Sequence, residues 1–320
     1  MERTLPSLTV LVPVYNSEGS LRPLVERLEP VLARLASEYE LILVNDASRD
    51  GSWAVVQELA RAKPWIRGIC MMRNYGQHNA LLCGIRAARY EIVATMDDDL
   101  QHPPEELEKL LVALDANTDV VYGTPQAERH GFLRDLASRV TKLALEKSMG
   151  AETASKVSAF RVFRADLRKA FENYQSQFVS IDVLLTWGTT RFRAVQVRHD
   201  PRTIGVSNYT FKKLLTHALN MMTGFSTLPL QLASWIGFVL SAVGIALVVF
   251  LVVLRVFTEH PVEGFTFIAS LITIFSGAQL FALGIIGEYL ARMHFRMMDR
   301  PTYAVRAEVG SGAKDAQRTS

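Results

Sequence analysis

The sequence has few cysteines and no marked excess of charge of either sign. Cys70 and Cys83 are the only cysteines among 320 residues. They do not have metal-ligand spacing, so we expect two ordinary core thiols rather than a disulfide framework or a zinc site. Lys and Arg number 35 against 32 Asp and Glu, a balance that points to no nucleic-acid partner. Residues 1–9 lack a charged segment followed by an apolar core, so we expect no signal peptide there.

Charge is missing altogether from two long stretches near the C-terminus. Leu230 to Leu254 and Gly264 to Gly287 contain no Asp, Glu, Lys or Arg. At ~1.5 Å per residue, each is long enough to cross a hydrocarbon core ~30 Å thick. We predict two transmembrane helices. The alternative is a pair of helices buried in a soluble core, where uncharged runs of about 18 residues seldom occur.

Basic residues flank these two stretches. Lys212 and Lys213 precede the first, and Arg292, Arg296 and Arg300 follow the second. The connection from Arg255 to Glu263 holds one Arg against two Glu. The positive-inside rule therefore predicts a multi-pass protein of the inner membrane with both ends in the cytoplasm. The same basic residues favour attraction to anionic lipid head groups.

Before these stretches, short β-branched runs alternate with helical patterns from Leu8 to about Arg198. This alternation predicts an α/β domain with a mostly parallel sheet. The predicted strands are Thr9 to Val12, Glu40 to Val44, Gly68 to Met72, Ile92 to Met96 and Val120 to Gly123. The predicted helices are Leu21 to Ser37, Ser52 to Ala62, Asn79 to Arg89, Pro104 to Asp115 and Phe132 to Met149. The domain is completed less regularly by Ala159 to Phe163, Ile181 to Trp187 and Phe192 to Val197.

Polar segments follow four of the predicted strands. They are Pro13 to Asn16, Asn45 to Ser48, Arg73 to Gln77 and Asp97 to Gln101. Sites in open α/β sheets form outside the carboxyl ends of the strands, so the four segments are expected to build one crevice. For Asn45 to Gly51 the alternative is a simple turn and helix N-cap.

The last of these segments contains two carboxylates two residues apart. Asp97 and Asp99 can point to the same side and share one divalent cation. Magnesium prefers such hard oxygen ligands, and substrate phosphates usually complete its octahedron. The alternative is an acidic helix entry, because Pro103 and Pro104 precede Glu105 and Glu106.

Tyr209 to Phe225 has apolar residues at helical spacing, with Lys212, Lys213 and His217 elsewhere. We predict an interfacial amphipathic helix leading into the first span, and the alternative is an internal helix of the soluble domain. Gly310 to Ser320 is small and polar, which is typical of a disordered tail.

Several motifs together resemble the family 2 glycosyltransferases, in the branch that charges polyprenyl phosphates with a sugar. They are Val10 to Asn16, Arg73 to Ala80, Met96 to Glu105, Gly205 to Tyr209, Gly287 to Arg292 and Arg300 to Tyr303. The chain is similar to bactoprenol glucosyltransferases and undecaprenyl-phosphate formamido-arabinose transferases, and more distantly to dolichyl-phosphate mannose synthases. The resemblance implies a GT-A catalytic domain at 1–208, an interfacial helix at 209–227, a transmembrane hairpin at 228–290 and a cytoplasmic juxtamembrane segment with a disordered tail at 291–320.

The resemblance also implies a role for individual residues. Asp97 and Asp99 correspond to the catalytic metal ligands together with Gln101, and the cofactor is Mg²⁺ or Mn²⁺. The donor nucleotide-sugar pocket corresponds to Pro13, Tyr15, Asn16, Glu18, Asp46, Asn74, Gly76, Gln77 and Asp98. Two departures stand out: the usual Asp-Asp-Gly-Ser reads Asn45 to Ser48 here, with Ala47 for the glycine, and the usual Ser-Lys-Tyr reads Ser207 to Tyr209.

An anionic acceptor needs positive charge, and the planar fork of Arg binds phosphate oxygens in pairs. The candidates for the acceptor phosphate are Arg129, Arg134, Ser138 and Arg202. Arg134 and Ser138 lie four apart on a predicted helix and so face the same way. For each arginine the alternative is a solvated or salt-bridged position on the surface.

These features predict a metal-dependent, inverting transfer of a sugar from a nucleotide-sugar, UDP-linked by analogy, to undecaprenyl or another polyprenyl phosphate. The resemblance implies a homotetramer. A processive polysaccharide synthase is one alternative, although the Gln-x-x-Arg-Trp motif of such enzymes is missing around Trp187. A non-catalytic membrane scaffold is the other. The sequence does not identify the sugar.

Overall fold

The computed structural model describes residues 5–125, 157–176, 178–200, 228–257, 264–298 and 300–310. The chain forms two compact units, one of Met1–Leu215 with Arg300–Ser320 and one of Thr216–Asp299. The helices expected at 132–149 and 209–225 lie outside the described residues.

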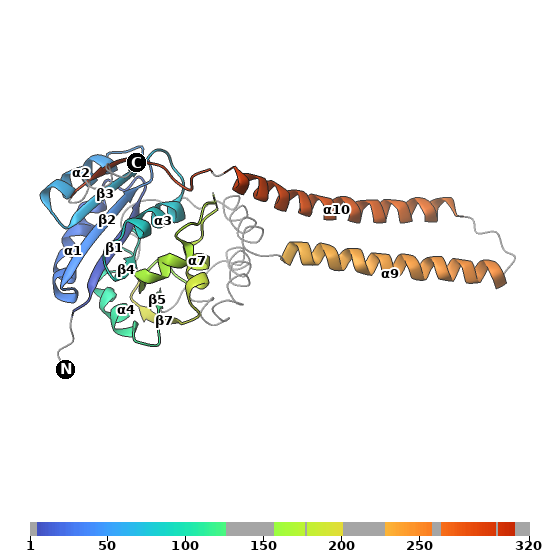
Figure 1. Cartoon of the computed structure of the whole chain (residues 1–320), viewed down its shortest axis with the longest axis horizontal. Helices are drawn as coiled ribbons and strands as arrows, with labels where there is room; N and C mark the ends of the chain where they lie inside the picture. Colours follow the sequence, from blue (N-terminus) through green and yellow to red (C-terminus); the bar gives the residue numbers. More distant parts are fainter. Residues whose placement is uncertain are drawn as a thin grey trace. The chain divides into compact units, whose positions relative to one another are not determined.

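The first unit is built on one eight-stranded sheet (Figure 1). Its strands are β1 (Ser7–Val14), β2 (Glu38–Asn45), β3 (Ile66–Met71), β4 (Ile92–Thr95), β5 (Val120–Pro125), β6 (Arg161–Arg164), β7 (Phe192–Val197) and β8 (Val305–Val309). The strand order is β7-β5-β6-β4-β1-β2-β3-β8. Strand β1 is parallel to β2 and β4, β2 to β3, and β5 to β7. Strand β6 is antiparallel to β4 and β5, and β8 to β3. The sheet is thus mostly parallel, as predicted.

Helices connect the strands and cover the sheet. They are α1 (Leu21–Leu35), α2 (Ser52–Ala62), α3 (Gln77–Ala87), η1 (Pro104–Glu106), α4 (Leu107–Ala113), η2 (Ala165–Phe171) and α7 (Ile181–Gly188). Val10, Val12 and Val14 of β1 pack with α1, α2 and α4 in the main core. Leu11 points to the other face because side chains alternate along a strand. There α3 approaches so closely that a Cβ on Gly84 would lie 2.0 Å from Leu11 Cδ1, so any other residue would displace the Leu11 side chain.

The edge strand β8 was not predicted from the sequence, which gave only a juxtamembrane segment and a tail for this part of the chain. Val305 pairs with Met71 and Val309 with Gly68. The Met72 N–H donates to Ala304 O at 2.8 Å, and Thr302 is buried. Residues 300–310 therefore join the sheet next to β3, and β8 begins at the carboxyl end of that strand. The alternation of Val305, Ala307 and Val309 with charged residues is the sequence signal for it.

The described residues of the second unit form two long helices, α9 (Leu228–Phe257) and α10 (Phe265–Met297). Pro229–Phe250 and Ile274–His294 are long and apolar enough to cross a membrane. Large apolar side chains on both helices are exposed, among them Phe238 at 68% and Leu280 at 69%. Such a surface suits lipid rather than water. Glu288 forms an ion pair with Arg292, at 2.7 Å from Oε1 to Nη2.

Candidate active site

Four turns follow the carboxyl ends of the adjacent strands β4, β1, β2 and β3, which brings the four polar segments to one edge of the sheet. Each turn contains a residue with positive φ: Asn16 at 55°, Ala47 at 51°, Gly76 at 96° and Leu100 at 59°. Three of the four are not glycine, and residues held in this region cost free energy that the surrounding structure must offset. Such strain clusters at functional sites.

The turns after β1 and β2 are joined by hydrogen bonds between backbone and side chain. The Asn16 N–H donates to Ser48 Oγ at 3.0 Å, and the Arg49 N–H donates to Asn16 Oδ1 at 2.8 Å. The Glu18 carboxylate accepts from the Gly51 N–H at 3.0 Å, at the start of α2. Asn16 and Glu18 thus shape the turns. Tyr15 is 39% exposed and Pro13 is half-buried, so both present surface at this edge.

Asp46 fixes the next turn. Its buried carboxylate accepts the Tyr75 N–H at 2.7 Å and the Gly76 N–H at 2.8 Å. Burial raises the pKa of Asp46, and these two N–H groups partly oppose that rise. Gly76, just before α3, adopts its φ of 96° without the steric cost that a Cβ would add. The Asp46 carboxylate therefore sets the path of the backbone that leads to Gln77.

The metal motif lies beside this turn. Gln77 Nε2 donates to Asp97 Oδ1 at 2.7 Å, and the Gln101 N–H donates to Asp99 Oδ1 at 3.1 Å. Burial raises the pKa of Asp98 to about 7, against a hydrogen bond from the Ser17 side chain, and the charges of Asp97 and Asp99 add to the rise. Three successive carboxyl groups and the turns after β1 and β3 therefore meet here.

The residues present fit a hard divalent cation. Asp97, Asp99 and the side chain of Gln101 offer oxygen ligands, which Mg²⁺ and Mn²⁺ prefer. In the described part of the chain, no three His, Cys, Asp or Glu side chains are grouped as a metal site. Asp97, Asp99 and Gln101 would supply a few of the ligands and leave positions for water and a substrate diphosphate, the usual arrangement for magnesium.

Most of the expected donor-site residues lie at this edge, including Asn74, which is exposed. Arg73 packs its guanidinium over the Tyr75 ring, 4.6 Å from the centroid. The acceptor candidates Arg129, Arg134, Ser138 and Arg202 lie outside the described residues, so they stay predictions.

Four residues near the site, Ser17, Thr95, Tyr122 and Arg161, were not singled out from the sequence. Ser17 bonds Asp98, and Thr95, Tyr122 and Arg161 form a buried cluster with Asp182 beside the end of β4. Arg161 and Asp182 each interrupt an apolar run, Ala159 to Phe163 and Ile181 to Leu185. A charged residue inside such a run was the available signal, because it must find a partner when it is buried.

Comparison with known proteins defines the class. Residues 9–174 match the model of glycosyl transferase family 2, a region that contains all four turns. The chain belongs to this family, which confirms the resemblance read from its motifs. The crystal structure of glucosyl-3-phosphoglycerate synthase from Mycobacterium tuberculosis in complex with Mn²⁺, UDP and glucosyl-3-phosphoglycerate is similar in fold, with a TM-score of 0.51. The two share 18% identity over 68% of this chain and 78% of that one.

Curated relatives extend the likeness over nearly the whole chain. The undecaprenyl-phosphate 4-deoxy-4-formamido-L-arabinose transferase of Photorhabdus laumondii is 34% identical over 310 residues, which cover 96% of this chain and 95% of the relative. The transferase of the same name from Proteus mirabilis is 33% identical, over 95% of this chain and 94% of the relative. The aligned length thus includes the two apolar helices as well as the sheet.

Proposed function

We propose that this protein is a membrane-anchored, metal-dependent, inverting glycosyltransferase that moves a sugar from a UDP-linked donor to undecaprenyl phosphate or a similar polyprenyl phosphate. The observation that supports it most is the placement of Asp97 and Asp99 at the strand ends, next to the turns after β1 and β3. The full-length similarity to undecaprenyl-phosphate transferases supports the acceptor.

Asp97 and Asp99, with Gln101, would hold the cation. When bound, Mg²⁺ or Mn²⁺ supplies Lewis-acid stabilisation of the charge that develops on a leaving diphosphate. Gln77 keeps Asp97 in place through its 2.7 Å hydrogen bond. Tyr15 and Pro13 offer exposed surface for the nucleotide, while Asp46 and Gly76 shape the turn beside it.

The nucleophile in this proposal is a phosphate oxygen of the acceptor. A phosphate monoester has a second pKa of ~6 and is mostly deprotonated at neutral pH, so the reaction needs no general base. Direct in-line attack inverts the anomeric centre. Arg129, Arg134, Ser138 and Arg202 remain our candidates for binding the acceptor phosphate, because guanidinium groups bind such oxygens in pairs.

The two long apolar helices would hold the enzyme at the membrane, where its acceptor is located. A polyprenyl chain is confined to the bilayer, so an enzyme with two spans and cytoplasmic basic flanks works where the phosphate head group lies. The proposal also places the catalytic domain and both chain ends in the cytoplasm. It includes domain boundaries at residues 208, 227 and 290, and a homotetramer.

The test uses the full-length protein in lipid nanodiscs with undecaprenyl phosphate, Mg²⁺ or Mn²⁺ and a panel of radiolabelled UDP-sugars. We expect one labelled lipid product with inverted anomeric configuration by NMR. Asp99→Asn should abolish it. Asp166→Asn is the matched control and should leave it unchanged, because Asp166 is exposed and pairs only with Lys169 among the contacts described.

The other outcomes separate the alternatives. A polymer in place of a single transferred sugar would indicate a processive synthase. No labelled product with any donor, from a protein that is folded and binds no Mn²⁺, would indicate a scaffold. Retention of the donor's anomeric configuration in the lipid product would contradict the in-line attack.

A further inference from the structure

A row of buried polar side chains crosses three neighbouring strands beside the metal motif. Thr95 of β4 pairs with Arg161 of β6, and Arg161 pairs with Tyr122 of β5. None of the three is more than 2% exposed. Residues paired across adjacent strands project from the same face of a sheet, so the three side chains form a line that ends at Thr95.

Asp182, in the first turn of α7, completes this row. It forms an ion pair with Arg161 Nη1 and accepts the Tyr122 hydroxyl at 3.0 Å. Burial raises the pKa of Tyr122, and the charge of Asp182 adds to it, so the phenol keeps its proton and donates. Arg161 Nε donates to Thr95 Oγ1 at 3.0 Å, and Thr95 Oγ1 donates to Ala159 O at 2.7 Å.

An ion pair this deeply buried is a poor way to stabilise a fold. Removing both charges from water costs about as much as their attraction returns, and apolar residues of similar volume often serve equally well. What a hydrogen-bonded pair does supply is fixed geometry, because a planar guanidinium allows few orientations of its partners. The parts of the protein that this row holds in place are those that lie next to it.

Two connections lead from the row to Asp97. The first runs along the backbone, because Thr95 is the last residue of β4 and Asp97 follows it by two residues. The second runs through α7 and α3: the Ile181 N–H donates to His78 Nδ1 at 3.3 Å, and the residue before His78 is Gln77, which holds Asp97. The end of β4 and the start of α3 are thus both tied to the Arg161–Asp182 pair.

We propose that Arg161 and Asp182 are positioning residues that hold the Asp97 carboxylate in the orientation needed to bind the cation. They touch neither the cation nor the substrate and act through Thr95 and α3. This inference rests on the proposed function in that it takes Asp97 to be a metal ligand. Partners that orient metal ligands typically change metal affinity or activity 10- to 100-fold when they are removed.

The same sheet contains a matched control. Glu40 of β2 and Arg67 of β3 form a second buried ion pair, at 3.0 Å, and Glu40 also accepts from Thr9 Oγ1 at 2.9 Å. This Thr–Glu–Arg cluster has the chemistry of the Thr95 row, but it lies toward the amino ends of the strands, away from the four turns.

The experiment replaces each pair by apolar residues of similar size, Arg161→Met with Asp182→Leu and Arg67→Met with Glu40→Leu, in the full-length protein. Mn²⁺ binding in the presence of UDP is measured by electron paramagnetic resonance, and the thermal unfolding temperature is measured in parallel. We expect the Arg161/Asp182 variant to need at least about 10-fold more Mn²⁺ for half-saturation, and the Arg67/Glu40 variant to match the wild type. Asp182→Glu, which keeps the charge, should recover part of the affinity.

Equal Mn²⁺ affinity in the wild type and the folded Arg161/Asp182 variant would overturn the inference. If that variant does not fold, the deciding variant is Thr95→Val, with Thr9→Val as its control. Thr95→Val removes the hydroxyl that links Arg161 to β4 and that donates to Ala159 O, and it leaves the Arg161–Asp182 pair in place. A several-fold loss of Mn²⁺ affinity in Thr95→Val alone supports the inference, and no loss overturns it. If the wild type transfers no sugar but the Mn²⁺ result holds, the proposed reaction fails and the positioning role stands.

Discussion

Gln77 Nε2 lies 2.7 Å from Asp97 Oδ1, so the first residue of α3 holds the first aspartate of the metal motif. The two residues lie on different turns, one after β3 and one after β4, and β1 and β2 lie between those strands in the sheet. The hydrogen bond therefore closes the site across the carboxyl ends of the strands.

Gln77→Leu keeps the volume of this side chain and removes the donor. We expect the Asp97 carboxylate to lose its fixed orientation, so kcat/KM should fall about 10- to 100-fold and the half-saturating Mn²⁺ concentration should rise. Steady-state kinetics over a Mn²⁺ titration measure both. Gln57→Leu, in the second turn of α2, is the control. Unchanged metal dependence in Gln77→Leu would show that Asp97 is oriented by other contacts.

Ala47→Gly should stabilise the protein. Ala47 has a φ of 51°, a region that costs an L-residue roughly 1–2 kcal/mol. Glycine removes this strain but adds about 0.4–1 kcal/mol of unfolded-state entropy, so we expect a net gain of about 0.5–1 kcal/mol. The unfolding temperature should rise by about 1–4 °C. Ala54→Gly is the control of opposite sign, because Ala54 lies inside helix α2, where glycine is unfavourable.

The order of strands and helices before residue 125 was predictable from the sequence because each element buries one apolar face. Helix α2, at Ser52–Ala62, matches the predicted bounds. The two long apolar helices followed from the absence of charge. Strand β8 was not predictable in the same way, because a five-residue edge strand is stabilised by its partner β3 rather than by its own composition.

The candidate site was predictable in its residue types but not in its contacts. Because sites in open α/β sheets form outside the carboxyl ends of the strands, the sequence predicted Asp46, Gln77 and Asp97 at one edge of the sheet. The structure has all three at that edge. That Asp46 binds the backbone of Tyr75 and Gly76, and that Gln77 reaches Asp97, depends on the exact path of the turns. The pairing of Arg161 with Asp182 joins residues 21 apart in sequence through the packing of α7 on the sheet, which no local pattern encodes.

Asp46→Asn should weaken donor binding without removing the metal ligands. An amide at this position has one oxygen acceptor for two N–H groups and turns an NH₂ toward one of them, so the Tyr75–Gly76 backbone loses a buried hydrogen bond. The expected cost in stability is about 1–3 kcal/mol. We expect KM for the nucleotide-sugar to rise by about 10-fold, with a smaller change in kcat. An Asp46→Asn enzyme with wild-type KM would place the nucleotide away from this turn.

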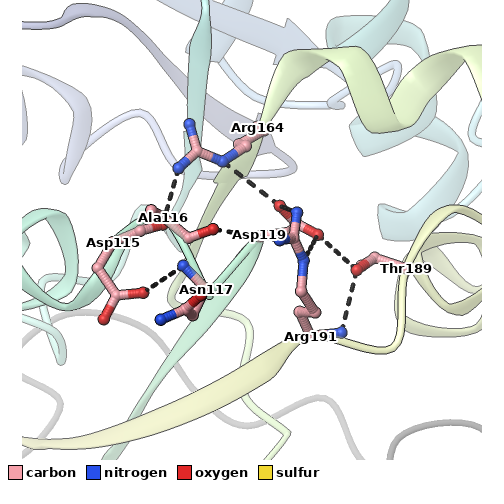
Figure 2. A network of polar contacts seen from close by, with 7 residues as sticks. All are labelled: Asp115, Ala116, Asn117, Asp119, Arg164, Thr189 and Arg191. Carbon is pink, nitrogen blue, oxygen red and sulfur yellow. Dashed lines mark hydrogen bonds and ion pairs between the residues drawn. The ribbon is translucent and has the colours of Figure 1, made fainter.

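Asp119 should govern part of the protein's stability in acid. It is buried at the start of β5, where Arg191 binds both carboxylate oxygens, at 2.7 and 2.9 Å (Figure 2). Arg164 lies 3.4 Å from Oδ1 and Thr189 donates to Oδ2 at 2.5 Å. Burial acts to raise the pKa of Asp119, but these hydrogen bonds and charges outweigh it and hold the pKa below its ordinary value of 3.8.

The folded state keeps the Asp119 carboxylate ionised to a lower pH than the unfolded state does. Its contribution to the free energy of unfolding is therefore complete above pH ~4 and is lost as the pH falls through the folded-state pKa. Asp119→Asn should therefore cost about 1–3 kcal/mol at neutral pH. The gap in unfolding temperature from the wild type should stay constant above pH ~5 and narrow below pH ~4. Thermal unfolding between pH 3 and 7, followed by tryptophan fluorescence, measures this gap. Asp166→Asn should follow the wild type throughout, since its partner Lys169 is an exposed neighbour on the same short helix. A gap for Asp119→Asn that does not change with pH would mean that the variant loses packing rather than charge.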